Sequence, residues 1–527
     1  MTGTWVLWRF ALRRDRILLP LWILGLAATA VFSVTATAGM YPTPASLSTA
    51  AETINATAAL VALYGKVYDP TSLGALSLIK LTAFGSTMVA ILFVFVVIRH
   101  SRAEEESGRL ELVGAGAVGR SAALAAAMLT GVVASGLLGA VTALGLAFAG
   151  LPMAGAAAFG LGWALSGIVF SAIAGLVAQL TRSARAAVGL GMAAVGLAYL
   201  LRAVGDVAVG DPGWASWLSP IGWSQQIRPF AGDRWQVAPL PLAAAAIFAS
   251  VAFWLRSRRD LGSGLLPDRP GSATGRVGGA FGLAWRLQRG MLAAWVVGAA
   301  LLGLVLGSIV NNVTGLLEYA QLRRYLALLG GAQGVTDAFL AAEVGLLGAI
   351  VAAYAVAATA RLRSEEVSGH VELLLSSPTT RIRWAAGHVV IAMIGVAAIM
   401  LTAGATIGLA HGLAVDAVLA EMVRLVGACA AQIPAAWVMS AVVVFLFGWR
   451  PRWVVAAWGL LLGCVLLAEF GKLWQLPNWL LDLSPFAHSP RLPGGSWAAG
   501  SLALLLLAVG ALAVAGLTRW RTRDLCA

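Results

Sequence analysis

The chain has 527 residues, of which 60% are hydrophobic and 11% are charged, and its mean hydropathy is +0.86. A water-soluble domain carries about 25% charged residues, so this composition excludes a soluble globular protein and predicts an all-α protein that crosses a membrane many times. The formal net charge of +13 does not indicate nucleic-acid binding, because the cytoplasmic loops of membrane proteins collect Lys and Arg.

The N-terminal region predicts an interfacial helix followed by a first span. Residues 3–14 place tryptophan and leucine side chains among Arg9, Arg13 and Arg14, a pattern typical of a helix lying on the cytoplasmic membrane surface. The apolar stretch 17–38 that follows is longer than the roughly 7–15 residues of a signal-peptide core. We therefore expect 17–38 to be retained as a span.

Twelve stretches of the chain are apolar over about the 20 residues that a helix needs to cross a bilayer. They are 17–38, 78–98, 121–149, 154–180, 186–205, 236–255, 291–312, 339–360, 384–410, 417–447, 453–471 and 497–518. Further surface helices are expected at 46–65, 281–290 and 315–335. Residues 258–280 are rich in Gly, Pro, Ser and Arg and predict a flexible cytoplasmic linker. The linker separates two transmembrane repeats of six spans, 1–257 and 281–527.

Arginine placement indicates which side of the membrane each loop faces. With the linker in the cytoplasm, the loops on that side hold 26 of the 36 Lys and Arg of the chain. Short cytoplasmic loops are enriched in these residues. We expect both termini on the cytoplasmic side of the plasma membrane. Arg202 is expected near an outer span end, with its side chain extended to the surface.

An acidic stretch occurs twice, each time after one span and before the next. The first motif is Arg102-Ala-Glu-Glu-Glu-Ser-Gly-Arg-Leu-Glu-Leu112, and the second, 261 residues later, is Arg363-Ser-Glu-Glu-Val-Ser-Gly-His-Val-Glu-Leu373. Seven of the eleven positions are identical, and the two copies align without a gap. A solvated helix whose acids balance nearby arginines would explain one copy, but ordinary loops diverge. Two copies favour a docking surface for a partner.

Two shorter matches recur at nearly the same spacing. Leu218-Ser-Pro220 returns as Leu483-Ser-Pro485, and Arg259-Asp-Leu261 returns as Arg523-Asp-Leu525. These matches predict a parallel duplication of a six-span unit.

Local features of the motifs predict a short helix with a bend or a tight contact in its middle. The Ser-Gly pair lowers helix propensity in the middle of each motif. Ser101 stands three residues before Glu104 and fits a capping box. The first and last glutamates, Glu104 and Glu111, are seven apart, which would place them on one face of a straight helix.

On these motifs, the interfacial helices and the Leu-Ser-Pro segments, the whole chain resembles the permease subunits of ATP-binding-cassette exporters. The resemblance is to the type-2 membrane fold, in the fused twelve-span form associated with export of polyketide antibiotics and other lipophilic drugs. It implies that each motif is a coupling helix seated in a cleft of an ATPase dimer. The residues that match the coupling motif are Glu104, Glu105, Ser107, Gly108, Glu111, Glu365, Glu366, Ser368, Gly369 and Glu372.

ATP chemistry is expected on another polypeptide. The sequence contains no Gly-x-x-x-x-Gly-Lys-[Ser/Thr] phosphate-binding loop. The chain is therefore expected to be a transport subunit and not an enzyme, with no cofactor of its own. ATP and Mg²⁺ would be bound by ATPase subunits, of which two copies suit two like repeats. The five histidines and three cysteines are scattered without metal-ligand spacing.

A path for a lipophilic substrate has weaker signals. Phe93, Phe95, Tyr354 and Trp458 lie in predicted spans and are candidates to line it, although packing against lipid or other helices is the stronger explanation of such aromatics. An ion-gradient-driven secondary transporter of hydrophobic compounds is the alternative function, since many carriers also have two six-span halves. A membrane-bound transferase or hydrolase is a third possibility, which would need clustered catalytic acids or histidines.

Overall fold

The computed structural model describes residues 2–56, 58–208, 212–266, 279–313, 331–470 and 477–525. Within these ranges every regular element is a helix. The chain divides into two compact units, Met1–Pro270 and Gly271–Ala527, each of which is described by itself below.

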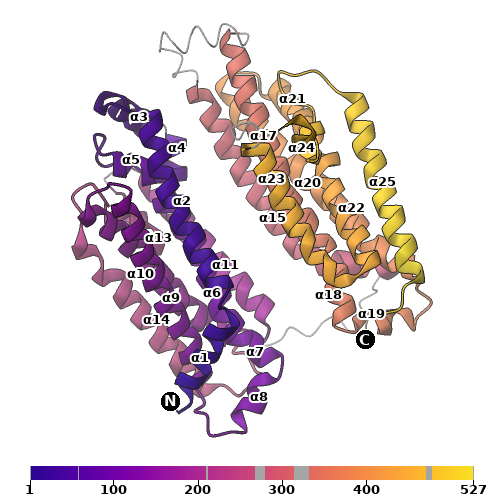
Figure 1. Cartoon of the computed structure of the whole chain (residues 1–527). Coiled ribbons are helices and arrows are strands. Elements are labelled where there is room, and N and C mark those ends of the chain that lie inside the picture. The colour runs from indigo at the N-terminus through magenta and orange to yellow at the C-terminus, as the bar shows by residue number, and fades with distance from the viewer. Residues whose placement is uncertain are drawn as a thin grey trace. The chain divides into compact units, whose positions relative to one another are not determined.

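The first unit is a bundle of long helices with short helices at both ends (Figure 1). Its elements are α1 (Thr4–Arg14), α2 (Leu18–Met40), α3 (Pro44–Ala56), α4 (Ala58–Tyr64), α5 (Leu73–Lys80), the π-turn η1 (Leu81–Gly85), α6 (Ser86–His100), α7 (Arg102–Glu106), α8 (Arg109–Gly114), α9 (Ala122–Phe148), α10 (Met153–Leu180), α11 (Ala184–Val207), α12 (Trp214–Trp217), α13 (Pro220–Gln226), η2 (Trp235–Val237) and α14 (Pro239–Arg258). The short α7 and α8 lie at the same end of this unit as α1.

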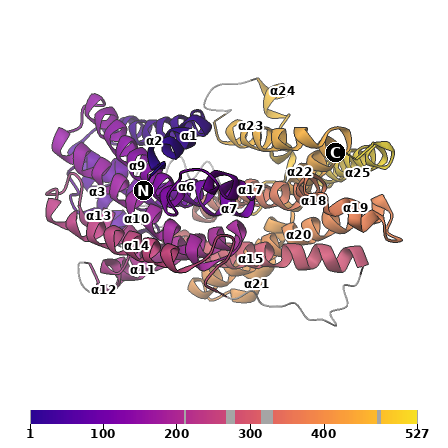
Figure 2. The same ribbon diagram turned by 90° about the horizontal axis from the view of Figure 1, so that it is seen from below.

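Helix α10 is the centre of the first unit, because it packs against α6, α9, α11 and α14. Glycines allow its closest contact. Gly160 on α10 faces Gly139 on α9, and a Cβ on either residue would collide with the carbonyl oxygen of the other. Small residues let helices in a membrane approach closely and gain packing contacts. Seen end-on, α1 lies beside α9 (Figure 2).

The second unit repeats this order of helices, but some helices that are separate in the first unit are continuous here, and others are interrupted at different positions. Its elements are α15 (Gly279–Val313), α17 (Gly331–Thr359), α18 (Arg361–Val367), α19 (His370–Leu375), α20 (Arg381–Ala414), α21 (Val418–Ala430), α22 (Ile433–Trp449), η4 (Pro451–Val455), α23 (Ala456–Phe470), α24 (Asn478–Leu481), η5 (Pro485–His488) and α25 (Ala499–Thr522). Helix α22 packs against α17 and α25, and Gly448 and Gly516 leave no room for a Cβ at the α22–α25 contact.

Eleven helices of the described residues are long and apolar enough to span a membrane, which confirms the all-α polytopic fold. The stretch expected at 453–471 corresponds to a shorter apolar helix, Pro451–Val465. The predicted surface helix at 281–290 is not separate, since α15 runs unbroken from Gly279 to Val313. Most of the expected helix at 315–335 lies outside the described residues.

Arg202 corrects a sequence-based prediction. Its side chain does not extend to the surface but is fully buried, and its Nη1 lies 3.2 Å from Asp206 Oδ2. Nη2 donates to the carbonyl oxygen of Ala62 at 2.6 Å. A buried guanidinium is stable only when its donors find acceptors, so Arg202 ties α11 to the short helix α4.

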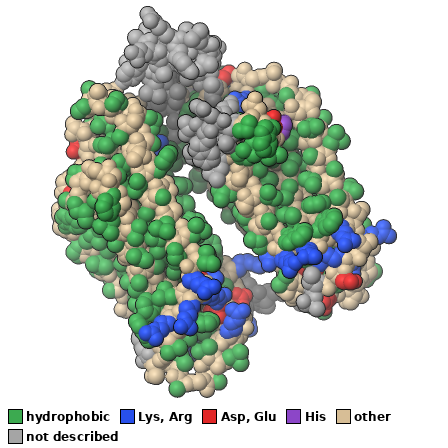
Figure 3. All heavy atoms as spheres, viewed as in Figure 1, with side chains coloured by type: hydrophobic (Ala, Val, Ile, Leu, Met, Phe, Trp, Pro, Cys, Tyr) green, Lys and Arg blue, Asp and Glu red, His purple; other side chains and the backbone are tan. Residues whose placement is uncertain are grey.

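The surface of each unit has the pattern of a membrane protein. On the face drawn in Figure 3, hydrophobic side chains cover the length of each bundle, whereas Lys and Arg side chains gather at one end. An apolar belt with basic residues beyond it suits a bilayer with headgroups at its edge.

Candidate functional site

Both acidic motifs fold as two short helices joined by a glycine in a left-handed conformation. In the first motif Gly108 has φ 74° and separates α7 from α8. In the second, Gly369 has φ 73° and separates α18 from α19. Any residue with a Cβ loses about 1–2 kcal/mol in this conformation. The predicted bend is therefore confirmed in both copies.

The bend overturns the single-face prediction for the glutamates. Glu104 lies on α7 and Glu111 on α8, so seven-residue spacing no longer places them on one helical face. The capping-box prediction is also wrong. Ser101 has no capping hydrogen bond, and its hydroxyl donates to the carbonyl oxygen of Val97 at 2.6 Å.

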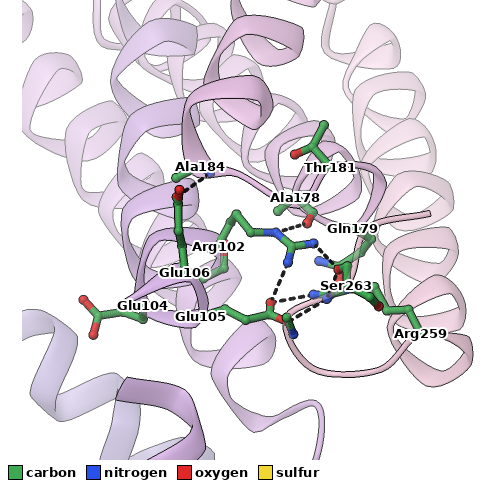
Figure 4. Close-up of polar contacts among 12 residues, drawn as sticks. Arg102, Glu104, Glu105, Glu106, Ala178, Gln179, Thr181, Ala184, Arg259 and Ser263 are labelled. Carbon is green, nitrogen blue, oxygen red and sulfur yellow. Dashed lines mark hydrogen bonds and ion pairs between the residues drawn. The ribbon is translucent and has the colours of Figure 1, made fainter. Parts of the chain in front are cut away.

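Glu105 is buried at the centre of an ionic cluster (Figure 4). Arg259 holds both carboxylate oxygens, with Nη1 and Nη2 donating at 2.6 and 2.7 Å. The backbone N–H of Gly262 also donates to Glu105, at 2.8 Å. Paired charge-assisted bonds of this kind are the strong ones in proteins. We call the Glu105–Arg259 pair the first clamp.

Arg102 extends the cluster to neighbouring backbone. Its Nη1 lies 3.2 Å from Glu105, and its Nε donates to the carbonyl oxygen of Ala178 at 2.8 Å. Its Nη2 donates to the carbonyl oxygen of Ser263 at 3.1 Å. The motif is thereby bound to the end of α10 and to the residues after α14. The predicted flexible linker, 258–280, includes these residues, of which Arg259, Gly262 and Ser263 bond to the motif.

The second unit holds an ion pair at the matching positions. Arg523 Nη2 donates to Glu366 at 2.8 Å, and we call this pair the second clamp. Aromatic rings support the guanidinium, whose carbon lies 4.9 Å from the ring centre of Trp520 and 5.4 Å from that of Phe447. Trp520 is fully buried and its indole N–H donates to the carbonyl oxygen of Arg381.

The first glutamate of each motif also has partners within its own unit. Glu104 forms an ion pair with Arg14 of α1 and lies 3.4 Å from Arg109. In Figure 4 its side chain points away from the cluster around Glu105. Glu365 lies 3.3 Å from Arg361 and 3.2 Å from His370. The leading glutamates are therefore engaged internally.

The later half of each motif is left at the surface. Leu112 is 80% exposed and Leu373 is 75% exposed. The neighbouring Glu111 and Glu372 are exposed too, as are Ser107 and Ser368. Gly108 is half-buried and Gly369 is exposed. A single exposed leucine is ordinary on a protein surface, but its recurrence at the same motif position in both units makes it a candidate contact for a partner.

A cavity of about 1100 Å³ lies beside the first motif. Its lining includes Glu106 and Glu111 of the motif, Arg182 of the loop before α11, and Leu190. Glu106 accepts a hydrogen bond from the backbone N–H of Ala184 at 2.8 Å, where a helix N-terminus favours negative charge. In the described part of the chain, no three His, Cys, Asp or Glu residues are grouped to hold a metal ion.

Asp15 fixes the end of α1 to the same end of the first unit. Its buried carboxylate lies 2.9 Å from Arg99 and 2.5 Å from His100. Burial acts to raise the pKa of Asp15. The hydrogen bond and charge of His100, with the charges of Arg99 and Arg14, outweigh that effect and lower the pKa below 3.8.

The aromatic candidates for a substrate path are divided between core and surface. Phe93 and Tyr354 are fully buried within their units. Tyr354 packs against Trp295, with ring centres 5.9 Å apart. Phe95 is 48% exposed and Trp458 is 44% exposed. The structure does not bring Phe93 and Phe95 to one face of α6, and the substrate path stays a prediction.

Sequence reasoning missed the basic partners of the buried glutamates. Arg259 and Arg523 lie 154 and 157 residues from Glu105 and Glu366, too far for any helical spacing to pair them. The signal was the repeated Arg-Asp-Leu segment, which returns at nearly the spacing of the acidic motif.

Comparison with known proteins identifies the family. A family model described as the C-terminal domain of the multidrug efflux system permease Rv1217c matches residues 277–521. The chain is also 43% identical over 527 residues to the multidrug efflux system permease protein Rv1217c of Mycobacterium tuberculosis (strain ATCC 25618 / H37Rv), and the match covers 99% of this chain and 95% of that protein. The chain therefore belongs to the multidrug efflux system permease family and is an integral protein of the cell membrane.

Proposed function

We propose that this chain is the membrane subunit of an ATP-driven exporter of lipophilic drugs, worked by two copies of a separate ATPase. The exposed later half of each motif carries the proposal. Leu112 and Leu373 project at matching positions of the two units, each beside an exposed glutamate. A cleft with an apolar floor and a basic rim on each ATPase copy is complementary to such a surface.

The missing phosphate-binding loop and the charge distribution support the same assignment. A permease without an ATP site of its own needs an energy source on another chain. Both motifs belong to the arginine-rich side, which the positive-inside rule assigns to the cytoplasm together with both termini. ATP and Mg²⁺ would then be bound by the ATPase copies and not by this chain.

The experiment is to co-express the chain with a candidate ATP-binding-cassette ATPase and to measure their affinity in nanodiscs. We expect Leu112→Ala with Leu373→Ala to weaken ATPase binding at least tenfold, as for loss of an apolar interface anchor. Trp479→Ala is the matched control, because this tryptophan is 67% exposed in α24, on the side assigned outward. Equal binding by both variants would refute the proposed docking surface.

A proton-coupled secondary transporter is the second candidate, and one cluster in the second unit favours it. Glu421 lies 2.8 Å from Arg424 and 3.9 Å from His411, and Arg424 lies 2.6 Å from Asp337. Glu421 and His411 lie in membrane-spanning helices and Asp337 lies just before one, and acids and histidines at membrane depth are the groups that proton carriers use. Drug efflux from vesicles separates the candidates, since the exporter needs ATP and persists when an ionophore removes the proton gradient. A carrier gives the opposite result.

A further inference from the structure

We infer that the two clamps, Glu105–Arg259 and Glu366–Arg523, are positioning pairs that pass movement of each acidic motif to the end of the last span of its unit. The inference rests on the proposed function, in which a partner moves the motifs. It assigns Glu105 and Glu366 to internal transmission, and leaves partner contact to the later half of each motif.

The first motif is not continuous with the helix of the span that precedes it. Ser101, between α6 and α7, has φ −120° and ψ −84°, outside the helical region. The helix is therefore interrupted at this residue, and α7 is not a rigid extension of α6. A force on α7 needs another route into the bundle.

The first clamp connects the motif to the bundle through buried side chains. The side chains of Arg259 and Glu105 are 3% and 5% exposed, so neither is available to a partner. Arg259 follows α14 directly and its Nε donates to Gln179 of α10 at 2.8 Å. One guanidinium thus connects the motif, the last span of the unit and its central helix. The planar guanidinium of an arginine fixes both the distance and the orientation of the carboxylate, whereas the flexible ammonium group of a lysine would not fix the orientation.

The clamp recurs in the second unit. Glu366 occupies the motif position of Glu105, and Arg523 follows α25 as Arg259 follows α14. The side chain of Glu366 is 1% exposed and that of Arg523 is 11% exposed. The supporting groups differ, being rings in one unit and amides in the other. Because the ion pair recurs while its surroundings differ, the feature that the two units share is the link between the acidic motif and the end of the last span.

The test uses the full chain with its ATPase in nanodiscs and measures drug molecules exported per ATP hydrolysed. We expect Glu105→Gln with Glu366→Gln to keep ATPase binding within twofold of wild type but to lower this ratio at least tenfold. Arg259→Lys with Arg523→Lys should lower it less, because charge remains and the planar guanidinium is lost. The exchanged pair Glu105→Arg with Arg259→Glu should restore part of the first-unit loss.

The matched control is Glu106→Gln, an exposed neighbour of Glu105 on the same helix whose new amide oxygen can still accept the hydrogen bond of the Ala184 N–H, and we expect an unchanged ratio. A merely structural role for the clamps would lower ATPase binding and transport together and leave the ratio unchanged, and that result would overturn the inference. An unchanged ratio with intact binding would overturn it as well. Failure of the proposed function is seen separately, as a wild-type chain that does not bind the ATPase.

Amide hydrogen exchange of residues 102–114 in the chain alone gives a reading that needs no ATPase. We expect at least tenfold faster exchange in Glu105→Gln than in Glu106→Gln, since only the first change breaks the clamp. Equal exchange in the two variants would contradict a clamp that holds the motif.

Discussion

The two units hold their acidic motifs by the same ion pair but surround that pair differently. In the first unit Glu105 receives both arms of Arg259 and the N–H of Gly262. In the second, Nη2 of Arg523 donates to Glu366, and the guanidinium lies against Trp520. A glutamine and a backbone N–H thus surround the first clamp, whereas aromatic rings flank the second.

The joins to the preceding spans differ as well. Ser101 interrupts the helix before the first motif, whereas Ala360 before the second motif stays in the helical region, with φ −61° and ψ −12°. The first motif is therefore coupled to its bundle through its clamp and the other polar contacts of α7, and the second through its clamp and the helical connection to α17. Substitutions in the two units should therefore differ in their effects, most of all at the arginines of the clamps.

Removing the arginine should affect the first unit more. Arg259→Ala leaves the buried Glu105 carboxylate without its main partner, and breaking a buried pair in this way costs about 3–5 kcal/mol. Arg523→Ala should cost less, about 2–3 kcal/mol, because the side chain of Arg523 is 11% exposed, against 3% for Arg259, and its removal lets water reach the remaining carboxylate more easily. Unfolding in detergent, followed by circular dichroism, measures both, with the exposed Arg258→Ala as control. Equal losses would contradict the difference between the clamps.

Aromatic support should matter only in the second unit. Trp520→Leu removes the ring beside Arg523 and the donor to the Arg381 carbonyl, and we expect a loss of about 2–3 kcal/mol in unfolding free energy. Hydrogen exchange should quicken in residues 361–375 and stay unchanged in residues 102–114. The prediction fails if the first motif responds as strongly as the second.

Substitution of the glycine at the bend should lower the unfolding free energy by the same amount in both units, because the two bends have the same backbone conformation. Gly108→Ala and Gly369→Ala each place a Cβ at positive φ and should each cost about 1–2 kcal/mol. No atom lies within 4 Å of the added Cβ at either site, so the cost is one of backbone conformation alone. Gly114→Ala, also with free space, is the control and should not destabilise. Thermal unfolding of the three variants would reveal an unequal response.

The smallest effect is expected at Asp15, which has a role in the first unit only. Asp15→Asn keeps the shape but loses the charge facing Arg99 and His100, at a cost of about 1 kcal/mol. Because the pKa of this carboxyl is lowered in the folded protein, its contribution is complete above the ordinary value of 3.8 and is lost as pH falls through the lowered one. A pH series of unfolding midpoints should therefore show the wild-type advantage above pH 4 and its disappearance in stronger acid.

The sequence predicted the features that depend on local pattern. Apolar length located the long helices, and the Ser-Gly pair of each motif located its bend. Prediction failed where one residue has to be paired with another far along the chain. Arg202 was assigned to the surface because Asp206 and the Ala62 carbonyl were not known to enclose it. Glu105 was assigned to a partner because nothing local reveals that Arg259 reaches it.

The central claim is that an ATPase binds the exposed ends of both motifs. The most direct measurement introduces cysteine at Leu112 and at Leu373, in a chain whose own cysteines are serine, and crosslinks each to the ATPase in nanodiscs. The account predicts a crosslink from each position to one ATPase copy, lost when the cysteine is moved to Trp479. ATP-independent efflux with no crosslink from either position would contradict it.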